Sequence, residues 1–326
     1  MHYNFCTLFD RNYATRGLAL YHSLLEQAGD FTLWILCMDD QVFQALSKLQ
    51  LPKVNLIRLT DLEDDELRQV KTTRSAVEYC WTLTPSLPLY ILTQHPELDH
   101  VTYLDADTYF YSSPQPIYDE WAGKSILIVS HNYAPRFIYK IPESGIYNVE
   151  FLIFRNDVNG LACLRWWRER CNEWCYFRLE DGKLGDQMYL NDWTTRFQGV
   201  QVLQHLGGGV APWNIERFRV WQQAGQVKID QLPVIFYHYH ALRWYGLSSY
   251  DPALGYWYMP RAVRRLIYQP YIQRLNQTFA QLKTVDSSIP SGIIQVSFWQ
   301  RLIRAIVLPI VNAFPFNYFY SRWHNG

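Results

Sequence analysis

Apolar segments of two kinds alternate along most of this 326-residue chain. A short apolar run predicts a strand, and a longer segment with an apolar residue every three or four positions predicts a helix. The predicted strands span Asn4–Phe9, Phe31–Met38, Val54–Leu59, Val101–Leu104, Ser125–Val129, Asn148–Phe154, Val200–Leu203 and Val234–Tyr239. Helices are predicted at Thr15–Glu26, Gln41–Leu49, Ser75–Leu92, which Pro85 and Pro88 break, and Leu161–Glu173. Strands that alternate with helices predict an α/β fold with a mainly parallel sheet and helices on both faces.

Two carboxylates, Asp105 and Asp107, follow the predicted strand Val101–Leu104. In open α/β sheets the ligand crevice lies at the carboxyl ends of the strands. On an extended strand, residues i and i+2 point to the same side, and like charges placed so close are costly unless a cation neutralises them. Mg²⁺ and Mn²⁺ take oxygen ligands and commonly join carboxylates to phosphates. The pair therefore suggests a metal site that holds a diphosphate, although a surface turn can produce the same tripeptide.

The turn after the first predicted strand carries Asp10, Asn12 and Tyr13. A carboxylate, an amide and an aromatic ring at this place can hydrogen-bond the edge of a base and stack on its face. Asp10 or Asn12 can equally cap the helix that follows. The residues alone leave both readings open.

Two later segments place polar side chains where a sugar could bind. Asn148 begins a predicted strand, and its side chain can hydrogen-bond a hydroxyl group. Asp186 and Gln187 lie in Leu184–Asn191, where a helix is predicted to begin. Polarity at the start of an edge strand and a helix N-cap are the structural alternatives.

His238 and His240 alternate on the last predicted strand and are followed by Arg243. Alternation places both imidazoles on one side of the strand. One of them can then ligate a metal ion, and the arginine can pair with a phosphate group. An isolated histidine is more often structural, so the argument depends on the pair and the arginine together.

Taken together, these segments resemble the GT-A-fold nucleotide-sugar glycosyltransferases, and most closely glycosyltransferase family 8, which contains bacterial galactosyltransferases and glycogenins. The similarity covers roughly residues 3 to 245. Tyr103–Thr108 resembles the family's metal motif, Asp10–Tyr13 its uridine-binding turn, and Asp186-Gln187 its sugar-binding and catalytic pair. His238-Tyr239 is similar to the start of its third metal-ligand segment.

The resemblance implies a Rossmann-like GT-A domain that moves a hexose from a UDP-sugar to a hydroxyl acceptor, a glycan or a lipid-linked molecule, with retention of configuration. The implied cofactor is Mn²⁺ or Mg²⁺, bound by Asp105, Asp107 and His238, with His240 as the alternative ligand. Asp186 and Gln187 are the implied catalytic residues. The implied donor-binding residues are Asp10, Asn12, Tyr13, Arg74, Asn148 and Arg243.

This chain departs from the family pattern at three places. The run after His238 is one residue shorter, and Arg243 stands near the position of the family's phosphate-binding lysine. The family's Asn-Ser/Ala-Gly strand is here Asn148-Val-Glu150, which predicts a different sugar pocket. The family's Tyr-Ala-Arg-Leu is here Tyr79-Cys-Trp-Thr82, and Arg74, five residues earlier, is the candidate for the missing charge.

Composition restricts the other function classes. The 30 Lys and Arg residues balance 30 Asp and Glu, which argues against a nucleic-acid partner. The phosphate-binding glycine motifs of dinucleotide and P-loop proteins do not occur in the sequence. A sugar-1-phosphate nucleotidyltransferase would carry a glycine-rich basic loop near its N-terminus, which this chain lacks. A non-catalytic nucleotide-sugar-binding protein is the remaining alternative.

The last segment does not fit the catalytic pattern, so we divide the chain into a catalytic domain, 1–260, and a helical and aromatic C-terminal extension, 261–326. Within the extension, apolar and aromatic residues combine with arginines between 297 and 323. The apolar stretch is too short to span a bilayer, so it fits either a segment on a membrane surface or a tail packed on protein. The N-terminus shows no signal-peptide pattern, which predicts a cytoplasmic protein, peripheral on the membrane if the tail binds lipid.

Overall fold

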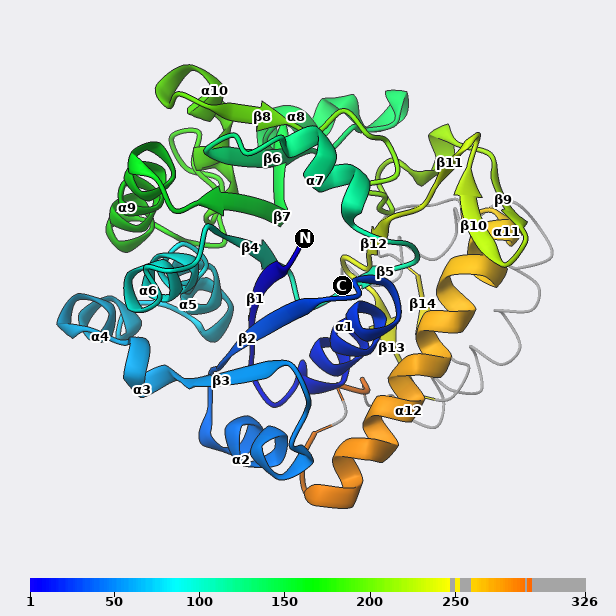
Figure 1. Ribbon diagram of the computed structural model, residues 1–326, viewed down its shortest axis with the longest axis horizontal. Coiled ribbons are helices and arrows are strands. Elements are labelled where there is room, and N and C mark those ends of the chain that lie inside the picture. The colour runs from blue at the N-terminus through cyan, green and yellow to red at the C-terminus, as the bar shows by residue number, and fades with distance from the viewer. Residues whose placement is uncertain (247–249, 253–258, 291, 295–326) are drawn as a thin grey trace, which may run out of the picture.

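The computed structural model describes residues 1–246, 250–252, 259–290 and 292–294 (Figure 1). Its centre is a seven-stranded sheet with the order β3-β2-β1-β4-β7-β6-β8. These strands are β1 (Tyr3–Phe9), β2 (Phe31–Cys37), β3 (Val54–Arg58), β4 (His100–Leu104), β6 (Ile126–Ser130), β7 (Tyr147–Arg155) and β8 (Val200–Val202). All neighbours in it pair in parallel except β7, which runs antiparallel to both β4 and β6. The prediction of a mainly parallel α/β sheet is confirmed.

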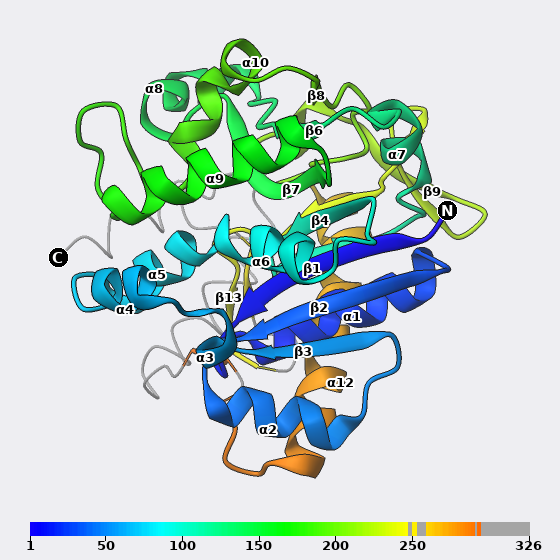
Figure 2. The same ribbon diagram turned by 60° about the vertical axis from the view of Figure 1, so that its left-hand side comes forward.

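Helices cover both faces of this sheet because its strands are apolar on both sides. On β1, Phe5 and Phe9 belong to one buried cluster, whereas Cys6 and Leu8 belong to another. The first cluster includes side chains of α1 (Ala14–Gln27), α2 (Asp40–Leu49) and α12 (Gln269–Val285), and the second includes those of α5 (Ala76–Leu83), α6 (Ser86–Gln94) and α9 (Val158–Glu173). The sheet lies between these two helical layers (Figure 2).

Local sequence signals account for several helix ends. Ser75 and Glu78 form a reciprocal capping box at the start of α5, and the side chains of Asp39 and Asp157 cap α2 and α9. The break predicted at Pro85 is confirmed, because α5 ends at Leu83 and α6 begins at Ser86. The break predicted at Pro88 is wrong, because Pro88 lies in the first turn of α6, where a backbone amide has no partner within the helix. The remaining helices are α3 (Leu59–Leu62), α4 (Asp65–Lys71), α7 (Gln115–Trp121), α8 (Ile141–Ser144), α10 (Trp193–Arg196), α11 (Arg261–Val263), the 3₁₀ helices η1 (Pro135–Lys140), η2 (Gln187–Asp192) and η3 (Ile215–Arg217), and the π-helical η4 (Arg264–Tyr268).

Smaller sheets lie beside the main one. In the one that shapes the site, β5 (Thr108–Phe110) pairs antiparallel with β12 (Phe236–His238), so His238 stands opposite Thr108. The others contain β9 (Val220–Gln223), β10 (Gln226–Ile229) and β11 (Leu232–Pro233), and β13 (Arg243–Trp244) with β14 (Tyr250–Asp251).

The described part of the C-terminal extension packs against the N-terminal half of the fold. The hydroxyl of Thr278 on α12 donates to the carbonyl of Thr15 on α1 at 3.0 Å, and Arg274 forms an ion pair with Glu26. Leu282 lies in the core cluster that also contains α1. The aromatic segment 297–323, for which we predicted membrane or protein contact, lies outside the described residues. Of the helices within the described ranges, none combines the length and the apolar character that crossing a bilayer requires.

We predict that Gly17→Ala destabilises the protein, although alanine is the better helix former. A Cβ at position 17 would overlap the ring of Phe9, which is buried between α1 and β1. Overpacking of this kind costs about 1 to 3 kcal/mol. Urea unfolding measures the change, with Gln27→Ala on the same helix as control. A Gly17→Ala variant more stable than wild type would show that α1 can move away from the sheet.

Candidate functional site

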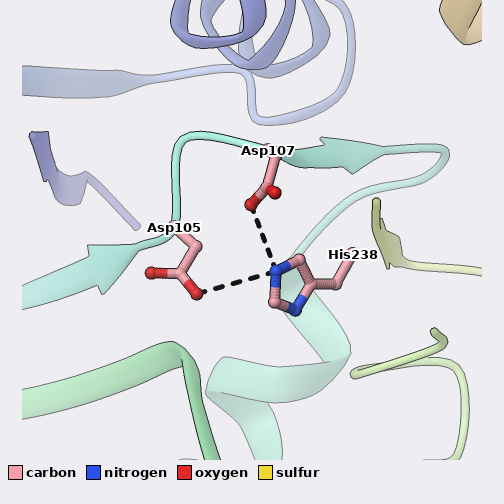
Figure 3. Close-up of side chains that lie close together, drawn as sticks. All are labelled: Asp105, Asp107 and His238. Atoms are coloured by element: carbon pink, nitrogen blue, oxygen red, sulfur yellow. Dashed lines mark ion pairs between the residues drawn. The ribbon is translucent and has the colours of Figure 1, made fainter. Parts of the chain in front are cut away.

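Asp105, Asp107 and His238 form one cluster (Figure 3). The Nε2 atom of His238 lies 3.1 Å from an oxygen of Asp107 and 3.7 Å from an oxygen of Asp105. One ligand atom from each residue lies within 4.8 Å of the others. The structure therefore brings together the three residues that we predicted to bind a metal ion. His240, the alternative ligand, has its ring centre 5.7 Å from that of His238 and is not part of this cluster.

The two carboxylates converge on a turn, whereas we expected an extended strand. β4 ends at Leu104, and residues 106 and 107 form a turn that leads into β5. The amide and the hydroxyl of Thr108 both donate to the carbonyl of Asp105, at 3.1 and 2.8 Å, and close this turn. The amide of Tyr239 donates to the carbonyl of Asp107 at 2.9 Å and ties the turn to the end of β12. The expectation of extended geometry was wrong, but the convergence that it predicted is present.

Burial and mutual repulsion control the charges in the cluster. Burial raises the pKa of Asp105, and the nearby charge of Asp107 adds to this effect, while His238 opposes it. Burial would also raise the pKa of Asp107, but the charge and the hydrogen bond of His238 outweigh it and lower that pKa. Burial would lower the pKa of His238, but Asp107 and Glu150 raise it well above its usual value. A proton on His238 thus occupies the place that a metal ion would fill.

Glu150, on β7, is a part of the site whose role the sequence did not show. Its side chain is fully buried, and its Oε2 lies 2.6 Å from Nδ1 of His238, on the side of the ring away from the aspartates. The backbone carbonyl of the same residue accepts the amide of Asp105 at 3.1 Å. From the sequence, Glu150 was only a departure from the family pattern, because a strand position does not reveal its partner on another sheet.

Asp186 is buried within electrostatic range of Asp105. Burial raises the pKa of Asp186 to about 7, and the charge of Asp105 contributes to this rise. Asp186 stands at the start of η2, but its carboxylate does not cap that helix. The structure therefore contradicts the alternative that Asp186 serves as an N-cap. The side chain of Gln187 is partly buried, and its Nε2 donates to the carbonyl of Ser144 at 2.6 Å.

The turn after β1 lies at the same edge of the sheet, because β1 and β4 are adjacent and parallel. The carboxylate of Asp10 accepts the amides of Asn12 and Tyr13, at 2.9 and 3.1 Å, and the side-chain amide of Asn12 at 2.7 Å. Asp10 therefore shapes the turn before α1, but it does not cap the helix, whose N-cap residue is Tyr13 and has no side-chain cap. Tyr13 is 44% exposed as a whole residue, but local burial of its hydroxyl and the charge of Asp107 raise the pKa of the phenol to about 12, so the hydroxyl lies near the cluster.

Arg16 is the cation beside the cluster, and sequence reasoning missed it. It is 5% exposed, its guanidinium lies 4.6 Å from the ring centre of Tyr13, and it donates to the carbonyl of Leu242 at 3.2 Å. Its charge helps to lower the pKa of Asp107. The available signal was an arginine within an otherwise apolar helix face, one turn after Tyr13.

The other predicted donor-binding residues are placed differently. The guanidinium of Arg74 donates to the carbonyl of Asn172 at 3.2 Å and stacks 3.9 Å from the ring centre of Tyr176. Arg243 lies on β13, partly buried, in the strand pair with β14. Asn148 is buried, with its Nδ2 3.0 Å from Nε2 of His131 and its oxygen accepting the amide of Glu150 at 2.8 Å. Their contacts to a donor molecule stay predictions.

Comparison with known proteins supports the fold. No family model matches the chain. The uncharacterized proteins YfnD and YfnF of Bacillus subtilis (strain 168) are 29% and 35% identical to it, over 90% and 86% of this chain and 94% of each relative. The galactosyltransferase LgtC, solved with donor and acceptor sugar analogues, aligns with a TM-score of 0.52 and 15% identity over 74% of this chain and 87% of LgtC. An active-site variant of LgtC, in which glutamate replaces a glutamine, aligns with a TM-score of 0.50 at the same identity and coverage. The chain has the GT-A fold of LgtC.

We predict that the metal-free protein loses stability as pH rises. Asp186 has an ordinary pKa of 3.8 and a pKa of about 7 when folded, so the stability linked to its proton is complete below pH 3.8 and is lost as pH rises through about 7. His238, with a raised pKa, acts in the same direction above its ordinary value of 6.5. Asp107 opposes this trend only in acid, because its pKa is lowered. Burial lowers the pKa of His131 to about 3 and that of His240 to about 4, so these histidines oppose the trend below about pH 6.5, and the loss of stability is expected above that pH. The contribution of Asp186 is on the order of a few kcal/mol.

Urea unfolding between about pH 6.5 and pH 8 in the presence of EDTA measures this slope. Mn²⁺ should weaken or reverse it, because a metal ion binds the deprotonated ligands. The Asp186→Asn variant should show a shallower dependence than wild type. A free energy of unfolding that rises with pH in the metal-free wild-type protein would contradict the assignment.

Proposed function

The chain belongs to the same protein family as YfnF, and we propose that it is a metal-dependent glycosyltransferase that moves a hexose from a UDP-sugar to a hydroxyl acceptor. The observation that carries this proposal is the cluster of Asp105, Asp107 and His238 in a GT-A fold. The cluster stands where strands of an open α/β sheet end, which is where such folds bind their ligands. Activity of LgtC as a galactosyltransferase supports the reaction class, although it does not identify the sugar here.

The donor set fits a divalent ion. Two carboxylate oxygens and one imidazole nitrogen suit Mn²⁺ or Mg²⁺, and the concentration of negative charge around Asp105 favours a cation. A bound ion would act as a Lewis acid that stabilises negative charge on the departing UDP. The residues of the chain hold the ligand atoms in place and keep His238 able to offer Nε2.

We assign the donor's nucleotide to the side of the cluster formed by α1. Tyr13 offers an aromatic face for the uracil ring, and Arg16, next to it, offers a fixed positive charge for a phosphate. Asp10 and Asn12 shape the turn that presents Tyr13, and they remain the proposed contacts to the nucleoside. Arg74, Arg243 and Asn148 stay proposed donor contacts.

We assign the reacting sugar to Asp186 and Gln187. Asp186 lies within electrostatic range of Asp105, which supports a role for its carboxyl group near the proposed metal. The hydrogen bond from Gln187 to Ser144 orients the side-chain amide. A glutamine is a poor nucleophile, so this pair favours retention by attack of the acceptor on the leaving-group side, assisted by a phosphate oxygen, over a covalent intermediate.

The reaction class is tested by incubating the protein with a panel of UDP-sugars and Mn²⁺. Release of UDP with transfer or hydrolysis of the sugar supports the proposal. Pyrophosphate chemistry would indicate a sugar-1-phosphate nucleotidyltransferase, and binding without turnover would indicate a nucleotide-sugar-binding protein.

The acceptor is proposed to be a glycan or a lipid-linked molecule. The segment 297–323 is the proposed peripheral membrane contact, and flotation of the full chain with liposomes, beside a chain that ends near Pro290, tests it. Equal flotation of the two proteins would remove the membrane proposal.

We predict that Asp107→Asn lowers Mn²⁺-dependent UDP-sugar turnover by roughly 100- to 1000-fold, because it removes one charged ligand from the cluster. Circular dichroism should show that the fold is retained. Asp181→Asn, at an exposed loop position, is the matched control and should leave turnover unchanged. Turnover by Asp107→Asn at the wild-type rate, unaffected by EDTA, would remove the metal from the mechanism.

We predict that Arg16→Gln weakens binding of UDP by about 10- to 100-fold, the usual effect of losing a charge-assisted hydrogen bond. Arg74→Gln is the comparison, because Arg74 is another proposed donor contact and its guanidinium, like that of Arg16, already contacts one backbone carbonyl and one aromatic ring. Calorimetric titration of UDP in the presence of Mn²⁺ measures both affinities, and thermal unfolding checks that each variant is folded. A larger loss in Arg74→Gln than in Arg16→Gln would assign the phosphate contact to Arg74 instead.

A further inference from the structure

We propose that Glu150 is a positioning residue that holds His238 in the orientation and protonation form needed to ligate the metal ion. The inference rests on the proposed metal site and names a residue that the family resemblance does not supply. Glu150 occupies the position where the resembling family has glycine in its Asn-Ser/Ala-Gly strand. In this chain, therefore, a carboxylate lies against His238, on the side of its ring away from Asp105 and Asp107.

When Glu150 is ionised, the geometry leaves one arrangement for the imidazole. Nδ1 of His238 lies 2.6 Å from Oε2 of Glu150, and Nε2 lies 3.1 Å from Asp107. Because an ionised carboxylate only accepts hydrogen bonds, Nδ1 must carry the proton that it donates to Glu150. When the ring is neutral, its lone pair is then on Nε2, the atom that faces the two aspartates. A carboxylate behind a ligating histidine fixes its tautomer and makes the metal-binding nitrogen more basic.

Glu150 also supports a second ligand through its backbone. Its carbonyl accepts the amide of Asp105, and its own amide donates to the side chain of Asn148 at 2.8 Å. Asn148 is held in turn by His131. Glu150 thus contacts two of the three proposed ligands: Asp105, in the turn after β4, and His238, on β12.

The rest of the fold makes room for this carboxylate. Oε1 of Glu150 is buried and has no hydrogen-bond partner among the described residues. Gly209 lies directly against it, and a Cβ at position 209 would stand 2.8 Å from Oε1 and 2.6 Å from a methyl group of Val129. Any larger residue at 209 would displace Glu150. A fully buried carboxylate with one unpaired oxygen is costly, so it is an unfavourable way merely to fill a core position.

The first test measures Mn²⁺ affinity by the electron paramagnetic resonance signal of the free ion, with purified protein and no donor substrate. We expect Glu150→Ala to weaken Mn²⁺ binding by about 10- to 100-fold, the usual effect of removing the partner of a ligating histidine. Glu150→Gln should cause a smaller loss, because its amide oxygen still accepts from Nδ1 but carries no charge. Glu143→Gln, at an exposed position, is the matched control and should bind like wild type.

The second test does not depend on a metal. Proton and ¹⁵N spectra of metal-free, histidine-labelled protein should contain a downfield, exchange-protected Nδ1 proton that disappears in His238→Gln, which assigns it. We expect the signal to disappear in Glu150→Ala and to move upfield in Glu150→Gln, whose isosteric side chain keeps the packing. Thermal unfolding establishes that each variant is folded.

The outcomes separate the two claims. If wild type binds no Mn²⁺ but shows the Nδ1 signal and loses it in Glu150→Ala, the metal proposal fails and the orienting contact stands. If wild type binds Mn²⁺ and both Glu150 variants bind it equally well with an unchanged histidine signal, Glu150 is not a positioning residue. Weaker Mn²⁺ binding together with the altered signal supports the inference.

Discussion

The antiparallel pairing of β5 with β12 is the interaction on which the site depends. It sets His238 opposite Thr108 and brings a late segment of the chain to the turn that carries Asp105 and Asp107. The hydrogen bond from Tyr239 to the carbonyl of Asp107 fixes the register at this point. A shift of one residue in this pairing would turn the imidazole of His238 to the opposite face of the sheet, because side chains alternate along a strand. The three ligands therefore exist as a cluster only in this register.

Several carboxylates lie close together with little exposure to solvent, and their negative charge suits the site to a cation. Asp105, Asp107 and Glu150 surround one imidazole, and Asp186 lies next to Asp105. Without a metal ion, the folded chain compensates by retaining protons, as the raised pKa values of Asp105, Asp186 and His238 indicate. The same groups that make the metal-free state sensitive to pH are those that a divalent ion and a diphosphate would engage. Stability and binding are thus linked through one set of protons.

Periodicity predicted the central sheet well because both of its faces are buried and its strands are short apolar runs, as in β1 and β2. Residue type and position at strand ends predicted Asp105, Asp107 and His238. The pattern could not show that β12 pairs with β5 outside the main sheet, because non-local pairing depends on packing between distant segments. It also could not identify Arg16, since a helical arginine usually lies in solvent, or the partner of Glu150.

Glu150 stands where the resembling family has glycine, and this changes which residues can support the metal ligands and which can contact a sugar. Both polar ends of the Asn148 side chain already have partners, His131 and the amide of Glu150, and the glutamate fills the space beside Gly209. Under the proposed assignment, β7 therefore serves the metal ligands, and its proposed contact to the donor is Asn148, whose polar atoms already have partners. Recognition of the sugar then falls to Asp186 and Gln187, and Ser144 orients the latter. The donor sugar is thus expected to follow changes in the segments around residues 144 and 186 more closely than changes in β7.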